Sequence, residues 1–353
     1  MAAVGGTVPT FVEMVRQLDP DGSAADIALL LSQATPLVDD LPFYPSNLAT
    51  AHRSTVQTGK PTVTRRRVNE PGSSSRGTTA QIVDGMAIYE TRSTVDKLLV
   101  DLAPTPSAKA AVRMNAGAWH IQALGETVED DVFYGSVADN DLAINGLTVR
   151  YDVLDGPTGA NIIDARDTGG DDDGDDDFTS IWLLGLGPRT IYGVYPMGSM
   201  AGIMHHDDGL RDRTDPTGSV DVGGAAMLSY RDVWGWHAGL VVHDWRYAVR
   251  ICNIDSAQLR NLTGSQAVTN HASNIIEMMG RAVDLLPNRN GIQPRFYMGR
   301  STKHGFNAAA RAMGYSNIWQ PVQINGQNVE AFMGIPIRVS DKILYTEDAV
   351  AAA

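Results

Sequence analysis

The chain has 353 residues and a formal net charge of −13, with 43% hydrophobic and 20% charged residues. A chain of this length and composition can bury a large core, which excludes wholesale disorder and favours two lobes or one elaborated fold. An acidic chain does not grip phosphate backbones along its length, so the charge balance argues against a dedicated nucleic-acid-binding protein.

The first 50 residues are predicted to be an acidic arm, because they carry six acidic residues against Arg16. Residues 23–34 are predicted to form a short helix that Pro36 ends. Residues 35–47 contain three prolines and are expected to be extended. The start of the chain lacks the pattern of a signal peptide, and we expect synthesis in the cytoplasm. An arm of this kind cannot form its own core and should lie on another surface.

Residues 51–92 reverse the sign of the charge, with seven basic and three acidic residues. Valine and threonine alternate with polar residues on either side of a loose centre, which predicts two strands of a long hairpin. A hairpin that is polar on both faces is marginal on its own and needs a partner surface. We therefore predict intersubunit contacts for Lys60, Arg65, Arg66 and Arg67, with acidic partners of the type of Asp39 and Asp40.

Residues 105–134 give the clearest helix signal, with Thr105 as a cap, Pro106 in the first turn and Gly135 after the end. Residues 181–253 are rich in β-branched and aromatic residues and are predicted to be strands. Within them, Trp245, Tyr247, Val249 and Ile251 are expected to share one strand face, and Cys252 to be a small buried hydrophobe. Further helices are predicted at 271–286 and 301–314, followed by a hairpin and a closing strand.

The run Asp171–Asp177 is the strongest local charge signal. A calcium loop of the helix–loop–helix type needs acids at alternate positions, glycine at the sixth and glutamate at the twelfth. With Gly174 sixth the loop would end at Ser180, and with Gly170 sixth it would start at Ala165, so the pattern fails in both registers. We interpret the run as a solvated surface loop, while weak binding of a divalent ion and the side of the molecule that it occupies stay open.

His205, His206, Asp207 and Asp208 are the other candidate metal or catalytic cluster. Adjacent residues of a strand point to opposite faces, so at most His205 with Asp207, or His206 with Asp208, could share a metal. A catalytic zinc needs three protein ligands, and no standard spacing is present. We interpret the segment as a polar turn and predict no catalytic, metal-binding or cofactor-binding residues. The tryptophans are expected in the core, at positions 234, 236, 245 and 319.

Several segments resemble, in order, those of the major capsid proteins of tailed bacteriophages. They are "TPLVDDLPFYPSNLATAHRSTVQTGKPTVTRRRVN" at 35–69, "GTTAQ" at 77–81, "YETRSTVDKLLVDL" at 89–102, "TSIWLLGLGPRTIYGVYPMGSMAGI" at 179–203, "HDWRYAVRICNID" at 243–255 and "GIPIRVSDKIL" at 334–344. Each motif is weak, but their ordered combination covers nearly the whole chain from about residue 24. The acidic run departs from this pattern and resembles an insertion.

The resemblance implies an α+β fold of the Hong Kong-97 type, with an N-arm, an extended β-hairpin loop, a peripheral domain with a long spine helix, and an axial domain. It divides the chain into an N-terminal arm (1–50), the extended loop (51–94), the spine helix and peripheral connection with the acidic loop (95–180), a strand-rich peripheral region (181–260) and an axial domain with closing strands (261–353). Lys60 is the one plausible crosslinking lysine on the hairpin, and covalent crosslinking stays open.

Such proteins assemble as hexamers and pentamers into an icosahedral shell around double-stranded DNA. The resemblance therefore implies a structural, non-enzymatic protein of the virion that binds itself, a separate scaffolding protein, a portal and a decoration protein. It implies enclosure of DNA without sequence-specific binding, and no membrane partner. Two alternatives stay open at this point: the shell of an encapsulin-like compartment, and a metal-dependent enzyme that uses His205, His206 and Asp207.

Overall fold

The computed structural model describes residues 35–166, 177–214, 226–256, 265–312, 322–324 and 327–351. The helix predicted at 23–34 and all of the acidic run except Asp177 lie outside these residues. The described chain forms two compact units, one with residues 88–128 and 202–237, the other with residues 35–87, 129–201 and 238–351. No described helix is long and apolar enough to cross a membrane.

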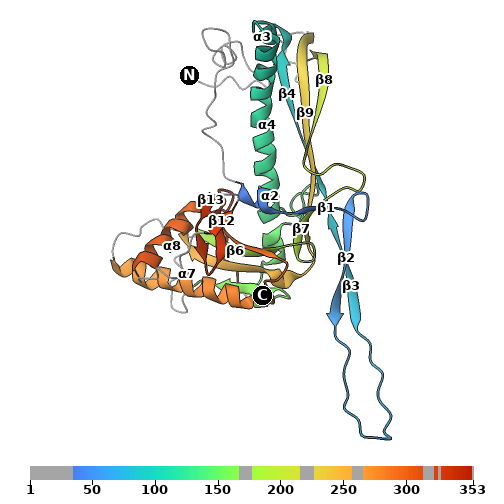
Figure 1. Cartoon of the computed structure of the whole chain (residues 1–353), viewed down its shortest axis with the longest axis vertical. Helices are drawn as coiled ribbons and strands as arrows, with labels where there is room; N and C mark the ends of the chain where they lie inside the picture. Colours follow the sequence, from blue (N-terminus) through green and yellow to red (C-terminus); the bar gives the residue numbers. More distant parts are fainter. Residues whose placement is uncertain are drawn as a thin grey trace. The chain divides into compact units, whose positions relative to one another are not determined.

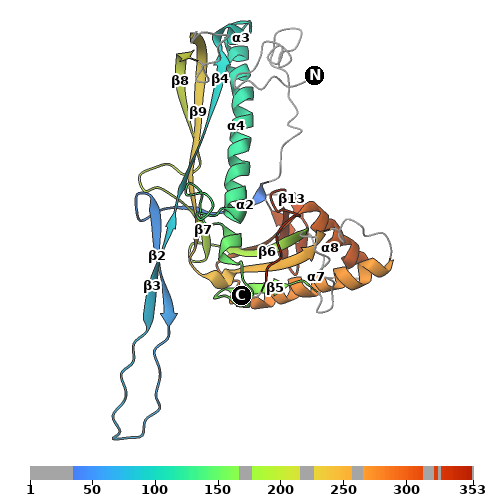
Figure 2. The same cartoon turned by 180° about the vertical axis from the view of Figure 1, so that it is seen from behind.

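The smaller unit is a helix packed on strands (Figures 1 and 2). It contains β4 (Ala87–Asp96), α3 (Lys97–Asp101), β8 (Ile203–Thr214), and the parts of α4 (Pro106–Tyr134) and β9 (Ala226–Val242) that fall within its bounds. Strand β9 lies between β4 and β8, and pairs with β8 in antiparallel register. Its core is a small apolar cluster of Val95, Leu99, Val100, Val112 and Ala116.

Helix α4 confirms the predicted helix and its ends. The hydroxyl of Thr105 accepts a hydrogen bond from the backbone N–H of Ala108 at 3.2 Å, which satisfies one of the free donors of the first turn. Pro106 occupies the first helical position, where its missing N–H costs nothing. At the other end, the N–H of Gly135 donates to the carbonyl of Asp131. The expected apolar stripe is buried at Val112, Leu124 and other positions, whereas Trp119 is 44% exposed.

The larger unit is built on a sheet whose central strand is β6 (Phe178–Leu186). Strand β6 pairs antiparallel with β10 (Ala248–Asp255) on one side and with β11 (Gln293–Met298) on the other. The sheet continues through short strands. Strand β5 (Ile162–Asp164) lies beside β10, and strands β15 (Ile335–Val339) and β14 (Ala331–Phe332) follow β11 in that order. Strand β7 (Ile191–Tyr195) pairs with β1 (Phe43–Pro45) and with the end of β9.

Helices α7 (Ser265–Leu285) and α8 (Arg300–Ala312) lie side by side against this sheet (Figure 1). The main core lies between the two layers, where Ile276 and Met279 of α7 and Phe306 of α8 pack on the apolar side chains of β6, β10 and β11. Because β6 and β10 are buried on both faces, their sequences are almost continuously apolar. Short elements complete the unit: α2 (Pro36–Asp40), α5 (Leu147–Arg150), η1 (Gly159–Asn161), η2 (Trp245–Tyr247), β12 (Val322–Ile324) and β13 (Gln327–Val329).

The predicted hairpin is present as β2 (Ala51–Gly59) and β3 (Thr78–Gly85), an antiparallel pair in a two-stranded sheet of its own. Its register runs from Ala51 opposite Gly85 to Gly59 opposite Thr78. Residues 60–77 connect the strands without regular structure, and every residue from 60 to 79 is exposed. The hairpin therefore has no core of its own beyond its base.

Three expectations for local structure are wrong. Residues 36–40 form the helix α2 rather than an extended segment, because Pro36 can start a helix as readily as it ends one. His205–Asp208 belong to strand β8 rather than to a turn. Trp245 and Tyr247 lie in the short helix η2, so only Val249 and Ile251 of the four residues expected on one strand face belong to a strand. Trp245 is also 39% exposed and does not lie in the core. Trp234, Trp236 and Cys252 are buried, as expected.

A glycine in α4 controls the approach of the helix to β9. A Cβ atom at Gly117 would lie 2.7 Å from the ring of Trp234, closer than real contacts allow. We expect Gly117→Val to destabilise the protein by roughly 1–3 kcal/mol, since overpacking outweighs the smaller gain from replacing a helical glycine. The matched control is Gly280→Ala in α7, where a Cβ meets nothing within 4 Å, and which should stabilise by about 0.5–1 kcal/mol. Chemical denaturation measures both, and equal stability of Gly117→Val and the parent would contradict the packing argument.

Candidate assembly site

The exposed part of the hairpin carries the basic residues predicted for intersubunit contact. Arg66 donates to the carbonyl of Glu70 at 2.8 Å, and the backbone N–H of Arg67 donates to the Glu70 carboxylate at 3.0 Å. These bonds close a turn in which Asn69 has a φ of +67°. Lys60 and Arg65 form no ion pair with any residue that the structure describes. The guanidinium groups at the tip are thus available to a second molecule.

The base of the hairpin is held by polar contacts within the larger unit. Arg150 of α5 forms an ion pair of 2.8 Å with Asp84 of β3, whose side chain is 5% exposed. On β2, a ring nitrogen of His52 lies 3.2 Å from the hydroxyl of Tyr192 of β7. Burial lowers the pKa of His52, so the ring is held in its neutral form. These contacts fix where the hairpin leaves the unit, while the hydrogen bonds of residues 60–77 to described side chains join residues of this loop to one another.

Asp40 lies at the end of α2, and its carboxylate is occupied inside the chain. Both of its oxygens accept from Arg338, at 2.6 and 2.8 Å, and it also accepts from Arg295 at 2.6 Å and from the hydroxyl of Tyr297 at 3.1 Å. Burial raises the pKa of Tyr297 well above its usual value, so the hydroxyl stays a donor. Asp39 is exposed. An intersubunit role stays a prediction for both, and Asp39 is the better placed of the two.

Glu129 of α4 holds the other end of α2. One of its oxygens accepts from the backbone N–H groups of Leu37 and Val38, at 3.0 and 3.3 Å, and the other accepts from the hydroxyl of Ser340 at 2.5 Å. The side chain is fully buried, and burial raises the pKa of Glu129 to about 7. Asp39 adds to this rise, whereas the three hydrogen bonds oppose it. A buried acid therefore joins the start of α2 to the closing segment after β15.

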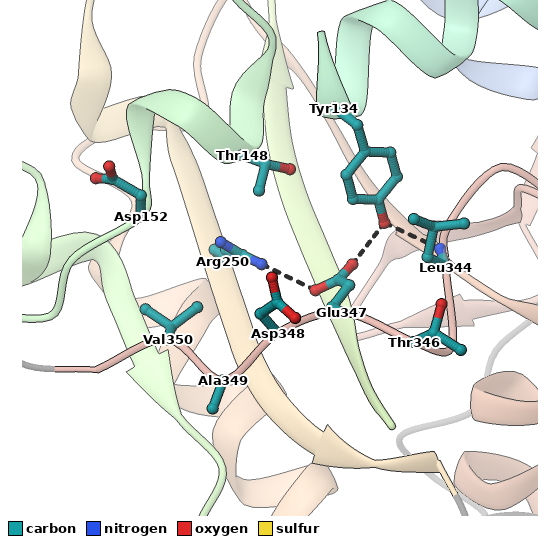
Figure 3. A pocket seen from close by; sticks show the side chains of 10 residues that line it. All are labelled: Tyr134, Thr148, Asp152, Arg250, Leu344, Thr346, Glu347, Asp348, Ala349 and Val350. Carbon is teal, nitrogen blue, oxygen red and sulfur yellow. Dashed lines mark hydrogen bonds and ion pairs between the residues drawn. The ribbon is translucent and has the colours of Figure 1, made fainter. Parts of the chain in front are cut away.

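A pocket with a volume of about 290 Å³ lies beside the end of α4 and the last residues of the chain (Figure 3). Its floor is an ion pair of 2.8 Å between Arg250 of β10 and Glu347, with side chains 2% and 5% exposed. Tyr134 donates to Glu347 at 2.5 Å, and Ser180 also donates to it. Burial and the Glu347 charge raise the pKa of Tyr134. The rim is acidic, because it carries the exposed side chains of Asp152 and Asp348.

Arg250 is satisfied on all sides of its guanidinium group. Besides Glu347, it donates to the carbonyl of Tyr151 at 2.8 Å and to the hydroxyl of Ser180 at 3.1 Å, and it lies 5.3 Å from the ring centre of Trp182. A buried charge needs this degree of pairing to be tolerated. The pair is therefore a structural link between the sheet and the C-terminal segment and not a free catalytic group.

The cluster around His205 is a salt-bridge network within the smaller unit. Arg113 of α4 donates to Asp232 at 2.7 Å and pairs with Asp207 at 2.8 Å. His205 lies 3.0 Å from Asp232 and stacks on Trp234 with ring centres 4.1 Å apart. The described residues contain no group of three histidine, cysteine, aspartate or glutamate side chains that could hold a metal ion. Here the acidic side chains bind an arginine and fasten α4 to β8 and β9.

Sequence reasoning missed Glu129, Arg250 and Glu347. Arg250 carries a usable signal, because it is a charged residue inside the apolar strand segment "YAVRICN". An arginine at such a position must find a buried acid. Which acid it finds cannot be read from the sequence, since Glu347 is 97 residues away. Glu129 lies next to Val128 on the apolar stripe of α4, where a carboxylate is similarly out of place.

Several solved structures are similar to this chain. A chain in the cryo-EM structure of bacteriophage Epsilon15 matches with 24% identity and a TM-score of 0.73, covering 99% of both chains. The capsid of bacteriophage JBD30 matches with 10% identity and a TM-score of 0.45, covering 96% of both. The SrpI encapsulin of Synechococcus elongatus matches with 11% identity and a TM-score of 0.43, covering 65% of this chain and 91% of the other. No curated protein sequence matches.

The fold is the α+β fold of Hong Kong-97-type phage capsid proteins, as expected. This is the fold of structural proteins that build capsid shells. The chain belongs to the family of the major capsid protein GP7, which it matches over residues 19–351. It is therefore a structural protein of a tailed-phage capsid shell.

Glu129 makes the stability of the protein depend on pH. The pKa of Glu129 is about 7 in the folded chain and near its ordinary value of 4.5 when unfolded, so the folded state binds more protons between these values. This group's contribution to stability is therefore highest below pH 4.5 and falls as the pH rises to 7, by on the order of 3 kcal/mol. Glu129→Gln keeps one acceptor oxygen for the N–H groups of Leu37 and Val38, places an amide donor beside the hydroxyl of Ser340, and cannot ionise. Unfolding of unassembled protein at pH 5 and pH 8 should therefore show that the variant gains stability relative to the parent at pH 8. Asp155→Asn, at an exposed site, is the control, and an unchanged difference between parent and Glu129→Gln across pH would contradict the assignment.

Proposed function

We propose that this chain assembles through hexamers and pentamers into an icosahedral shell that encloses the double-stranded DNA genome of a tailed phage. The observation that carries the proposal is the basic hairpin of a capsid-family chain, whose residues 60–79 are all exposed and form no core of their own. A segment of this kind becomes stable when it lies on another subunit. The net charge of −13 suits enclosure of DNA without sequence-specific binding.

The hairpin residues Lys60, Arg65, Arg66 and Arg67 are the proposed contacts to neighbouring subunits. All four side chains are exposed, and the loop that bears them can follow the shape of a partner surface because it has no regular structure. Asp39 is the exposed acid of the arm, and Asp40 contributes by holding α2 in place through Arg295 and Arg338. Opposite charges across such an interface steer association and set its register.

The finer assignments follow from the same proposal. The chain is made in the cytoplasm of the bacterial host and ends in the virion, without enzymatic activity. Its partners are further copies of itself, a separate scaffolding protein, a portal and a decoration protein. Residues 1–50 act as the N-arm, 51–94 as the extended loop, 95–180 as the spine helix and its connection, 181–260 as the strand-rich peripheral region and 261–353 as the axial domain.

The discriminating experiment is imaging of the purified protein together with light scattering on the same sample. Closed shells tens of nanometres across support the proposal, and nucleic acid inside shells from infected cells distinguishes a phage capsid from a cargo-packaging encapsulin-like compartment. Small discrete oligomers that persist at high concentration and with scaffolding protein present would overturn it. Stoichiometric bound metal in such oligomers would then favour the enzyme alternative based on His205, His206 and Asp207.

Replacing the arginine triplet should separate assembly from folding. Arg65–Arg67→Ala removes three exposed charges from a loop that contacts no core. The free energy of unfolding of the unassembled protein should therefore change by less than about 0.5 kcal/mol. The protein concentration needed for shell formation should rise by at least about tenfold, because each ~1.4 kcal/mol lost from a repeated contact is a factor of ten. Sedimentation of assembled material measures this. A triplet variant that assembles as the parent does would show that these arginines are only solvated surface.

A further inference from the structure

The pocket floored by Arg250 and Glu347 has an unbalanced charge. Its lining contains one cation, Arg250, whose charge Glu347 neutralises at 2.8 Å. Asp152 and Asp348 remain, both exposed, and neither makes an ion pair or a side-chain hydrogen bond with any described residue (Figure 3). The pocket thus offers two free carboxylates above a neutral floor. Such a surface attracts a cation from outside the chain.

The size and lining of the pocket indicate what kind of cation it fits. Its volume of about 290 Å³ is at the lower limit of the ~300–1,000 Å³ typical of small-molecule sites and suits one long side chain. The walls include Leu344, Ala349 and Val350, which match a methylene stem, while the acids match its charged head. A guanidinium fork pairs with carboxylates in a bidentate manner that an ammonium group cannot reproduce. The chemistry therefore favours an arginine.

The hairpin of the same chain carries a surface that complements this pocket. Arg65, Arg66 and Arg67 are exposed, and two apolar residues near them, Val63 and Val68, are each 90% exposed. The rim of the pocket offers the counterpart, since Leu344 is 44% exposed beside the free acids. Because every residue from 60 to 79 is exposed, the hairpin does not occupy the pocket of its own chain. A second copy supplies both the arginine and the apolar contact.

We propose that this pocket is the socket for an arginine from the Arg65–Arg67 segment of a second copy of this chain. The inference rests on the proposed assembly through the hairpin, and it names the landing site of that hairpin. One arginine inserts its stem past Leu344, and its guanidinium group pairs with Asp348, while Asp152 on the opposite side of the pocket adds a second negative charge (Figure 3). Arg250 and Glu347 keep the floor of the socket rigid, so the backbone that carries Asp348 is positioned before the partner arrives.

Charge reversal on each side tests the pairing in the full-length protein. One variant carries Asp152→Arg and Asp348→Arg, a second carries Arg65–Arg67→Asp, and a third combines all five changes. Each of the first two should raise the concentration needed for shell formation at least about tenfold, and the combined variant should recover most of that loss, because close interfacial charge pairs couple strongly. Asp141→Arg makes the same kind of charge change at an exposed residue outside the pocket and should assemble as the parent does.

A milder pair of changes guards against a folding defect, since an arginine at 348 could compete for Glu347. Asp152→Asn with Asp348→Asn removes the charges without adding new ones, and its unfolding curve should match that of the parent while its assembly weakens. If the pocket variants assemble as the parent does while the hairpin variant fails, the socket is wrong and assembly through the hairpin stands. Failure of the combined variant to recover also overturns the socket. A parent protein that forms no shells would instead overturn the proposed function itself.

Discussion

The buried ion pair between Arg250 and Glu347 is the contact on which the arrangement of the larger unit depends. It joins strand β10 to the C-terminal segment, and through Tyr134 and Ser180 it also reaches the end of α4 and the central strand β6. Removing one partner of such a pair leaves a buried charge, at a cost of roughly 3–5 kcal/mol. The same pair forms the floor of the pocket, so the geometry of a surface site depends on an interaction inside the fold.

Helix α2 is fastened by the same physical means. Glu129 accepts the N–H groups that open α2, and Asp40 at its end binds Arg295 and Arg338. Leu37 is the buried apolar residue of this helix. Directional polar bonds hold a short segment in one register, which a small apolar contact cannot do. Both ends of the described chain are therefore attached by carboxylates, whose roles the pattern of hydrophobic residues does not predict.

Local signals allowed correct prediction of the long helix and the hairpin, because caps, prolines and strand alternation act over a few residues. The cap at Thr105 and the presence of two strands in the hairpin needed no knowledge of the rest of the chain. The site was not predictable in the same way, since Arg250 and Glu347 meet only after the sheet and the C-terminal segment have formed. The histidine segment of β8 was mistaken for a turn because its polar side chains face Arg113 and Asp232 rather than a core.

A contact made by an unstructured hairpin suits a shell built from many copies. Ordering residues 60–77 on a partner costs conformational entropy, so a single docking event of the proposed kind is weak. In the proposed shell each subunit both gives a hairpin and receives one, and the second and later contacts form within an assembly already held together. Weak individual contacts let misplaced subunits leave, whereas closure makes the whole shell stable. An apolar hairpin of equal area would lose this reversibility, which gives a physical reason for the charged residues at its tip.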